Sequence, residues 1–144
     1  SIKLFKVLRH RRHIGIEKFI IGPNMSNLTE QIIRHASDAA VDVSSELQAE
    51  DIRLMDVRGI SDFADYFVIM TTQSPRHMRA IRDAIELSLK NDGINLHHRE
   101  GDHNSGWALL DYGDLVIHMF SRDFRDFYDL ESAWTEARTL SIIQ

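Results

Sequence analysis

The chain has 144 residues, of which 43% are hydrophobic and 27% are charged, which is typical of one globular domain with a single hydrophobic core. It contains no cysteine, which excludes a disulfide framework, thiolate zinc sites and cysteine nucleophiles. The formal net charge is −5, and no apolar run approaches the roughly 20 residues of a membrane helix, so we expect no membrane insertion.

The charge is divided unevenly along the chain. Residues 1–24 carry six basic side chains against one glutamate, whereas residues 25–144 carry 11 basic and 21 acidic side chains, a net charge of −10. Phosphate backbones repel so acidic a body, because nucleic-acid affinity depends on Lys and Arg displacing counterions. Direct nucleic-acid binding by residues 25–144 is therefore disfavoured, and a basic protein is the complementary partner.

The first 24 residues precede a different pattern, and three interpretations stay open for them. In the first interpretation, Met25 is the original start and the preceding residues are not native. In the second, residues 1–24 are a native extension that packs through its apolar side chains. In the third, they are a basic transit peptide. The basic run at 9–13 is interpreted as a solvated tail, with contact to nucleic acid as the alternative. Residues 25–144 are predicted to form one domain.

The domain is predicted to begin with a helix and two strands. Ser26 or Asn27 caps the helix, which continues with apolar residues at helical spacing to about residue 48. Strands are predicted at 51–57 and 66–72. The second strand is a continuous apolar run, which is typical of a strand that is covered on both faces.

A second helix begins at Ser74 and Pro75, because serine is a favoured N-cap and proline is favoured at the first helical position. Gly93 ends it by adopting a left-handed conformation. Its buried side is predicted to consist of Met78, Ile81, Ile85, Leu87 and Leu89.

The rest of the domain is predicted as a strand-rich segment followed by a helix. The elements are an edge strand at 94–99, a loop at 100–106, a hairpin of strands 107–111 and 115–120 that turns near Tyr112-Gly113, and a helix at 122–137. Strands and helices mixed in this order predict an α/β fold of the mixed α+β kind, in which helices pack against a mixed sheet.

Two carboxylates and a histidine in the hairpin are the first candidates for an active site. Asp111 and Asp114 flank the turn, where carboxylates stay solvated or bond the turn backbone. His118 shares a strand face with Val116 and Phe120, and a histidine in such surroundings is more often packed than catalytic. We interpret Asp111, Asp114 and His118 as non-catalytic residues.

Other candidates for chemistry are weaker. His97 and His98 point to opposite sides of a strand, so they cannot both bind one metal ion. His103 and Ser105 lack the strand–turn–helix elbow of a hydrolase, and no phosphate-cradling glycine loop is present. The sequence therefore predicts no enzyme, no metal and no cofactor. Three helix arginines are interpreted as a solvated face, with anion binding as the alternative: Arg76, Arg79 and Arg82.

Aromatic residues concentrate in the hairpin and the terminal helix, where they are candidate interface anchors. They are Trp107, Tyr112, Phe124, Tyr128 and Trp134. Carboxylates of the same region would surround such a patch with negative charge: Asp111, Asp114, Asp123, Asp126, Asp129 and Glu131. This combination favours docking on a basic protein surface.

Four segments resemble a known family over roughly residues 27–135. They are DVRGISDFADYFVIMTTQSPRHMRAI at 56–81, REG at 99–101, GWALLDYGDLVIHMF at 106–120 and FYDLESAW at 127–134. Together they are similar to the ribosomal silencing factor family, also called RsfS or Iojap-like. The chain departs from the family at Thr72, where members often have glycine, and at Pro75, where they often have serine. No glycine-dependent loop contact is therefore carried over.

The resemblance implies a mixed five-stranded sheet flanked by helices, with nucleotidyltransferase-like topology but without the catalytic carboxylates. It implies a cytoplasmic translation repressor that binds the large ribosomal subunit through the basic ribosomal protein uL-fourteen and sterically blocks joining of the small subunit. The alternatives are a factor for large-subunit assembly or a nucleotidyltransferase-like enzyme. Homodimerisation through the same face would compete with ribosome binding.

The resemblance also implies site residues. The family's partner-binding side includes the tryptophan that opens the hairpin, here Trp107, and Glu100 stands in a family motif. We extend the predicted partner-binding set along the hairpin and the terminal helix to Leu110, Asp111, Tyr112, Asp114, His118, Tyr128 and Trp134.

Overall fold

The computed structural model describes residues 23–133 and 137–144, so the predictions for residues 1–22 and for Trp134 lie outside the described residues. The elements in chain order are α2 (Pro23–Glu46), β1 (Glu50–Asp56), β2 (Tyr66–Thr72), α3 (Pro75–Asn91), β3 (His98–Asp102), β4 (Trp107–Asp111), β5 (Leu115–Ser121), α4 (Arg122–Tyr128), α5 (Leu130–Ala133) and β6 (Arg138–Ile143).

The strands form one mixed sheet in the order β3-β4-β5-β2-β1-β6. β2 and β5 are parallel, and every other neighbouring pair is antiparallel. The predicted fold class is confirmed. The expected number of five strands is wrong, because the segment after the terminal helices adds β6 alongside β1.

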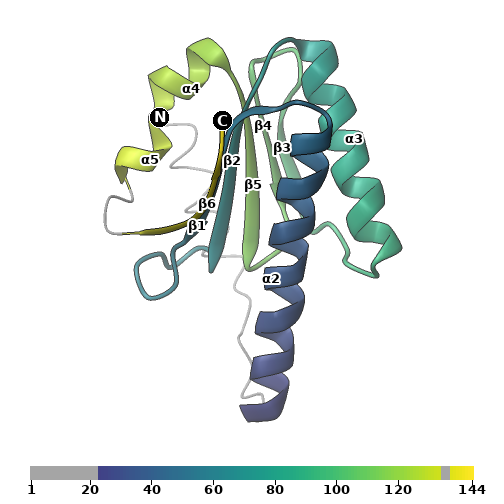
Figure 1. Cartoon of the computed structure of the whole chain (residues 1–144), viewed down its shortest axis with the longest axis vertical. Coiled ribbons are helices and arrows are strands. Elements are labelled where there is room, and N and C mark those ends of the chain that lie inside the picture. The colour runs from purple at the N-terminus through teal and green to yellow at the C-terminus, as the bar shows by residue number, and fades with distance from the viewer. Residues whose placement is uncertain (1–22, 134–136) are drawn as a thin grey trace.

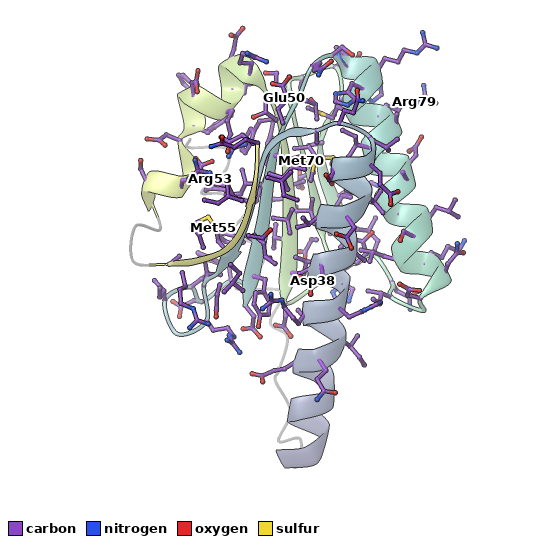
Figure 2. The ribbon with its side chains drawn as sticks, in the orientation of Figure 1. Asp38, Glu50, Arg53, Met55, Met70 and Arg79 are labelled. Atoms are coloured by element: carbon purple, nitrogen blue, oxygen red, sulfur yellow. The ribbon has the colours of Figure 1, made fainter. Side chains whose placement is uncertain are left out.

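Helices cover both faces of the sheet: α2 and α3 lie on one side, and α4 and α5 lie on the other (Figure 1). Each side has its own apolar cluster. Met70 belongs to the cluster under α2 and α3, whereas Met55 belongs to the cluster on the α4 side (Figure 2). β2 is buried along its whole length because it lies between the two layers, as its continuous apolar run predicted.

The structure of α3 agrees with its sequence signals. The Ser74 side chain accepts a hydrogen bond from the backbone N–H of His77 at 3.0 Å, and Pro75 is the first helical residue. Gly93 follows the helix with φ +78°. Four of the five predicted core residues are buried, but Leu87 is 60% exposed, so its predicted burial is wrong.

The boundaries of three elements differ from the predictions by more than a residue or two. α2 begins at Pro23, before the expected caps, and its core side includes Ser37 and Ser44, whose hydroxyls donate to carbonyls one turn earlier. The edge strand is at 98–102 rather than 94–99. The helix expected at 122–137 is interrupted by Asp129, whose left-handed φ of 42° ends α4.

Within residues 23–133 and 137–144, none of the helices has the length and apolar composition that crossing a bilayer requires.

Candidate protein-docking face

The alternation of β4 divides the predicted partner-binding residues between two sides of the sheet. Leu110 and Tyr112 pack in the cluster under α2 and α3, and Trp107 packs in the cluster on the α4 side. All three are at least nine-tenths buried. The predicted set is therefore not one continuous surface.

The turn of the hairpin is held by its own carboxylate. The Asp111 side chain is 6% exposed and accepts a hydrogen bond from the backbone N–H of Gly113 at 2.8 Å. The carbonyl of Asp114 accepts from the backbone N–H groups of Asp65 and Tyr66 at 2.8 and 3.0 Å. The prediction that a carboxylate bonds the turn backbone is confirmed for Asp111.

His118 is fully buried among aromatic rings on the α4 side of the sheet. Its ring stacks on Phe120 with centroids 6.0 Å apart and meets the edge of Phe67 at 5.4 Å. This confirms the prediction that His118 is packed. Over the part of the chain that the structure describes, no three His, Cys, Asp or Glu side chains gather to hold a metal ion.

Glu100 lies on β3, at one edge of the sheet, where it pairs with Leu109 of β4. One of its carboxylate oxygens is 2.7 Å from Nε2 of His98. Both side chains are only partly buried. Glu100 therefore lies beside β4. Within the described residues its side chain bonds His98 and is not seen to contact the aromatic residues of α4.

Five aromatic side chains form what we name the α4 aromatic cluster: Trp107, Phe120, Phe124, Phe127 and Tyr128. The Tyr128 ring is its centre, with ring centroids 5.3 to 6.4 Å from those of the other four. Trp107 is 3% exposed at the bottom of the cluster, whereas Phe127 is 71% exposed at its surface. The cluster therefore offers one large apolar side chain to a partner on a packed aromatic base.

A buried arginine fixes α4 to the sheet. Arg125 is 6% exposed and donates from Nη1 to the carbonyl of Asp51 at 2.9 Å and to the hydroxyl of Thr71 at 3.0 Å. It also forms ion pairs with the carboxylates of Asp51 and Glu131. These contacts join α4 to β1 and β2, so Phe127 projects from a fixed element.

The exposed surface around Phe127 is acidic. Asp123, Asp126 and Asp129 are all exposed, while the neighbouring cation Arg122 pairs with Glu50 at 2.5 Å. Glu131 is engaged by Arg125. The carboxylates that remain toward solvent give α4 a negative surface potential.

Phe127 was absent from the predicted partner-binding set. Its spacing from Phe124 on the helix indicated only that it belongs to the apolar side, and most apolar helix residues are buried. In the structure Phe127 is 71% exposed, one residue before α4 ends at Tyr128. The sequence pattern did not indicate this exposure.

The fold, the buried Arg125 and the acidic aromatic surface describe a small mixed α/β protein with one exposed aromatic side chain on an anchored helix. The chain belongs to the family described as "ribosomal silencing factor during starvation", whose model matches residues 29–144. This confirms the resemblance that the sequence motifs indicated.

Several known proteins are similar to the chain. It is 40% identical over 90 residues to a ribosomal silencing factor RsfS of Bacillus subtilis, which covers 62% of this chain and 76% of the relative. It is 32% identical over 102 residues to the chloroplastic protein Iojap of Zea mays, covering 69% of this chain and 43% of that protein. A crystal structure of a protein from Chromobacterium violaceum matches 78% of this chain and 92% of its own, with a TM-score of 0.68 and 27% identity.

Membership of this family assigns the chain to a ribosome-associated, translation-silencing class of proteins. The class is regulatory rather than catalytic by its description.

Proposed function

We propose that the protein represses translation by binding the large ribosomal subunit through the basic ribosomal protein uL-fourteen, which sterically blocks joining of the small subunit. The observation that carries the proposal is Phe127, 71% exposed among carboxylates on the anchored helix α4. Large exposed aromatic side chains on a rigid base are typical anchors of protein interfaces.

Charge supports a protein rather than an RNA as the immediate partner. Residues 25–144 have a net charge of −10, and exposed aspartates surround Phe127. Such a surface is repelled by ribosomal RNA and attracted by a basic protein. Occlusion needs no bond to be made or broken, so the proposal requires neither a metal nor a catalytic residue.

The proposal is tested by sedimenting the full chain with purified large ribosomal subunits. Phe127→Ser is expected to lower the affinity by about 2 kcal/mol or more, because it removes the anchor without opening a core cavity. Ile32→Ser is the matched control, since Ile32 is 45% exposed on α2, on the other side of the sheet. Circular dichroism confirms that both variants fold.

Adding small subunits completes the experiment. The wild type is expected to reduce the yield of joined ribosomes, and Phe127→Ser is expected to restore it. A wild type that does not sediment with large subunits, or that sediments but leaves joining unchanged, would overturn the proposal. A steep loss of binding with salt would indicate contacts to RNA phosphates instead.

Three further parts of the proposal concern the chain as a whole. We propose that residues 25–144 act as one domain, that the protein works in the cytoplasm, and that a homodimer formed through the α4 surface competes with ribosome binding. Sedimentation velocity of wild type and Phe127→Ser tests the last point, because the variant is expected to dimerise more weakly.

A further inference from the structure

The residues that precede α2 have the opposite charge to the folded domain. Residues 1–22 contain six basic side chains and one glutamate, whereas residues 25–144 have a net charge of −10. Residues 2–12, IKLFKVLRHRR, hold five of those six basic side chains and no acidic one, interleaved with five apolar side chains. We name residues 2–12 the basic segment. It combines cations with apolar groups, which is the composition that complements an acidic surface with an exposed aromatic ring.

The surface of α4 offers such a complement. Phe127 is the most exposed of the large hydrophobic side chains in the described part of the chain, at 71%. Asp123 lies four residues before it, on the same side of the helix, and Asp126 and Asp129 are also exposed. Neither Asp123 nor Asp126 forms an ion pair within residues 23–133 and 137–144. The α4 surface therefore has an uncovered apolar ring and negative charge that no neighbouring cation neutralises.

The next most exposed apolar side chain, Leu87 of α3, has different surroundings. It is 60% exposed and shares a hollow with Asp83, Glu86 and Arg99. Arg99 pairs with Glu86, and Asp83 pairs with the neighbouring Arg82. A cationic segment gains little at this position, because both carboxylates already have cationic partners. Charge complementarity therefore favours α4 over α3.

The chain that joins the basic segment to α2 is long enough to reach α4. Figure 1 shows the start of α2 and the helix α4 at opposite ends of the molecule. Residues 2–22 can span up to about 70 Å, which is about twice the length of the 24-residue α2, about 36 Å. Tethering by a short linker gives an effective concentration on the order of 1 mM, so a contact with a millimolar dissociation constant is already well populated.

We propose that the basic segment docks on the α4 surface of its own chain and competes there with the basic protein partner. Apolar side chains of the segment would contact the ring of Phe127, and its cations would pair with Asp123, Asp126 and Asp129. The chain would thus carry its own competitor, and release of the segment would free the surface. This regulatory consequence rests on the proposed function, whereas the intramolecular contact does not.

A nitroxide spin label on the full chain tests the contact. Because the chain has no cysteine, Ser1→Cys provides a single attachment point and leaves every charge of the basic segment in place. Amide resonances of α4 are expected to broaden and to recover when ascorbate reduces the label. The broadening is expected to be lost in Phe127→Ser and in the triple variant Arg9→Gln, Arg11→Gln, Arg12→Gln. It should also weaken as salt is added, because exposed charges are screened.

Matched controls remove the same kinds of group elsewhere. Arg76→Gln, Arg79→Gln and Lys90→Gln together remove three exposed cations from α3, where Figure 2 labels Arg79. Ile32→Ser removes a 45% exposed apolar side chain from α2. Both controls are expected to keep the broadening. A spectrum without broadening, or broadening that survives the triple arginine variant, would overturn the proposal. So would broadening that arises only between spin-labelled and isotopically enriched copies in a mixture, since the occupant would then be a second copy.

Sedimentation with purified large ribosomal subunits tests the competition. A segment that covers the surface in about 70–90% of the molecules lowers the apparent affinity about three- to tenfold. The triple arginine variant is therefore expected to bind the subunits more tightly than the wild type by that factor. Equal or weaker binding would overturn the competition, and weaker binding would assign the arginines to contacts with RNA phosphates.

The two measurements separate this inference from the proposed function. Broadening in a chain that does not sediment with large subunits would support the intramolecular contact and contradict the proposed function. Sedimentation without broadening would support the proposed function and overturn the intramolecular contact.

Discussion

Tyr112 couples the protonation of one buried hydroxyl to folding. Its pKa rises from an ordinary value of 10.0 to about 12, chiefly because burial disfavours the phenolate. Between these two values the unfolded chain loses its proton while the folded protein keeps it, so stability falls as the pH rises. Denaturant unfolding between about pH 9 and pH 12 should show a loss of about 2 kcal/mol that is absent in Tyr112→Phe. Identical losses in both proteins would contradict the assignment.

Asp56 has the opposite behaviour. Its carboxylate accepts hydrogen bonds from the Arg58 side chain at 2.7 and 3.0 Å, and these bonds lower its pKa below the ordinary value of 3.8. The ionised form is favoured by folding, so this stabilisation is present above pH 3.8 and is lost as the pH falls below it. Asp56→Asn is therefore expected to lower the free energy of unfolding by about 1 kcal/mol at pH 7. This is less than a buried charged pair would contribute, because Arg58 is partly exposed to water.

Chemical denaturation at several pH values tests this expectation. The difference between wild type and Asp56→Asn should shrink as the pH falls toward 3. Asp42→Asn, on the exposed side of α2, is the control and should show no such difference. A pH-independent cost of Asp56→Asn would assign it to packing instead.

The pairing of β3 with β4 leaves no room for a side chain at Gly101. Gly101 has φ +72°, and a Cβ there would lie 2.2 Å from the backbone oxygen of Trp107. Gly93 has φ +78°, but a Cβ there would have no atom within 4 Å. Alanine at either position carries left-handed strain of about 1 kcal/mol. Gly101→Ala should destabilise the protein by a further 1–3 kcal/mol or so, because two backbones cannot move apart cheaply.

The comparison of Gly101→Ala with Gly93→Ala in urea denaturation isolates that clash. Equal unfolding free energies for the two variants would show that β3 and β4 can move apart to admit the added Cβ without a loss of stability.

Elements with strong local signals were predictable, and elements that depend on partners were not. Ser74 and Pro75 mark the start of α3 through the backbone groups of the first turn alone. By contrast, β6 alternates weakly between half-buried and exposed residues, and it becomes a strand because β1 pairs with it. The break at Asp129 likewise depends on a backbone conformation that a non-glycine residue adopts rarely.

The candidate docking face was predicted in part. The concentration of aromatic residues in the hairpin and the terminal helix could be read from the sequence, and it indicated interface anchors because aromatic residues often have that role. Which of these rings faces solvent could not be predicted, because exposure depends on elements that are distant in sequence. Trp107 of β4 is covered, whereas Phe127 of α4 is exposed, although both lie in segments rich in apolar residues.

β6 completes the sheet of the whole molecule. It covers the outer edge of β1, and Leu140 and Ile143 pack on the cluster under α2 and α3. Removing residues 137–144 should lower the free energy of unfolding by several kcal/mol, since apolar contacts are lost and an edge is opened. Light scattering should then detect concentration-dependent association. An unchanged denaturation midpoint without association would show that β6 contributes little.

The order of the strands has a consequence for a chain that is cut. A break at the exposed Asn104 would place β3, β2 and β1 on one fragment and β4, β5 and β6 on the other. Neighbours in the sheet would then belong to different fragments at three junctions: β3–β4, β5–β2 and β1–β6. After a protease cuts this loop, the two fragments would stay associated in the folded protein. Refolding after denaturation would then be a bimolecular reaction of the two fragments, so its yield would depend on protein concentration.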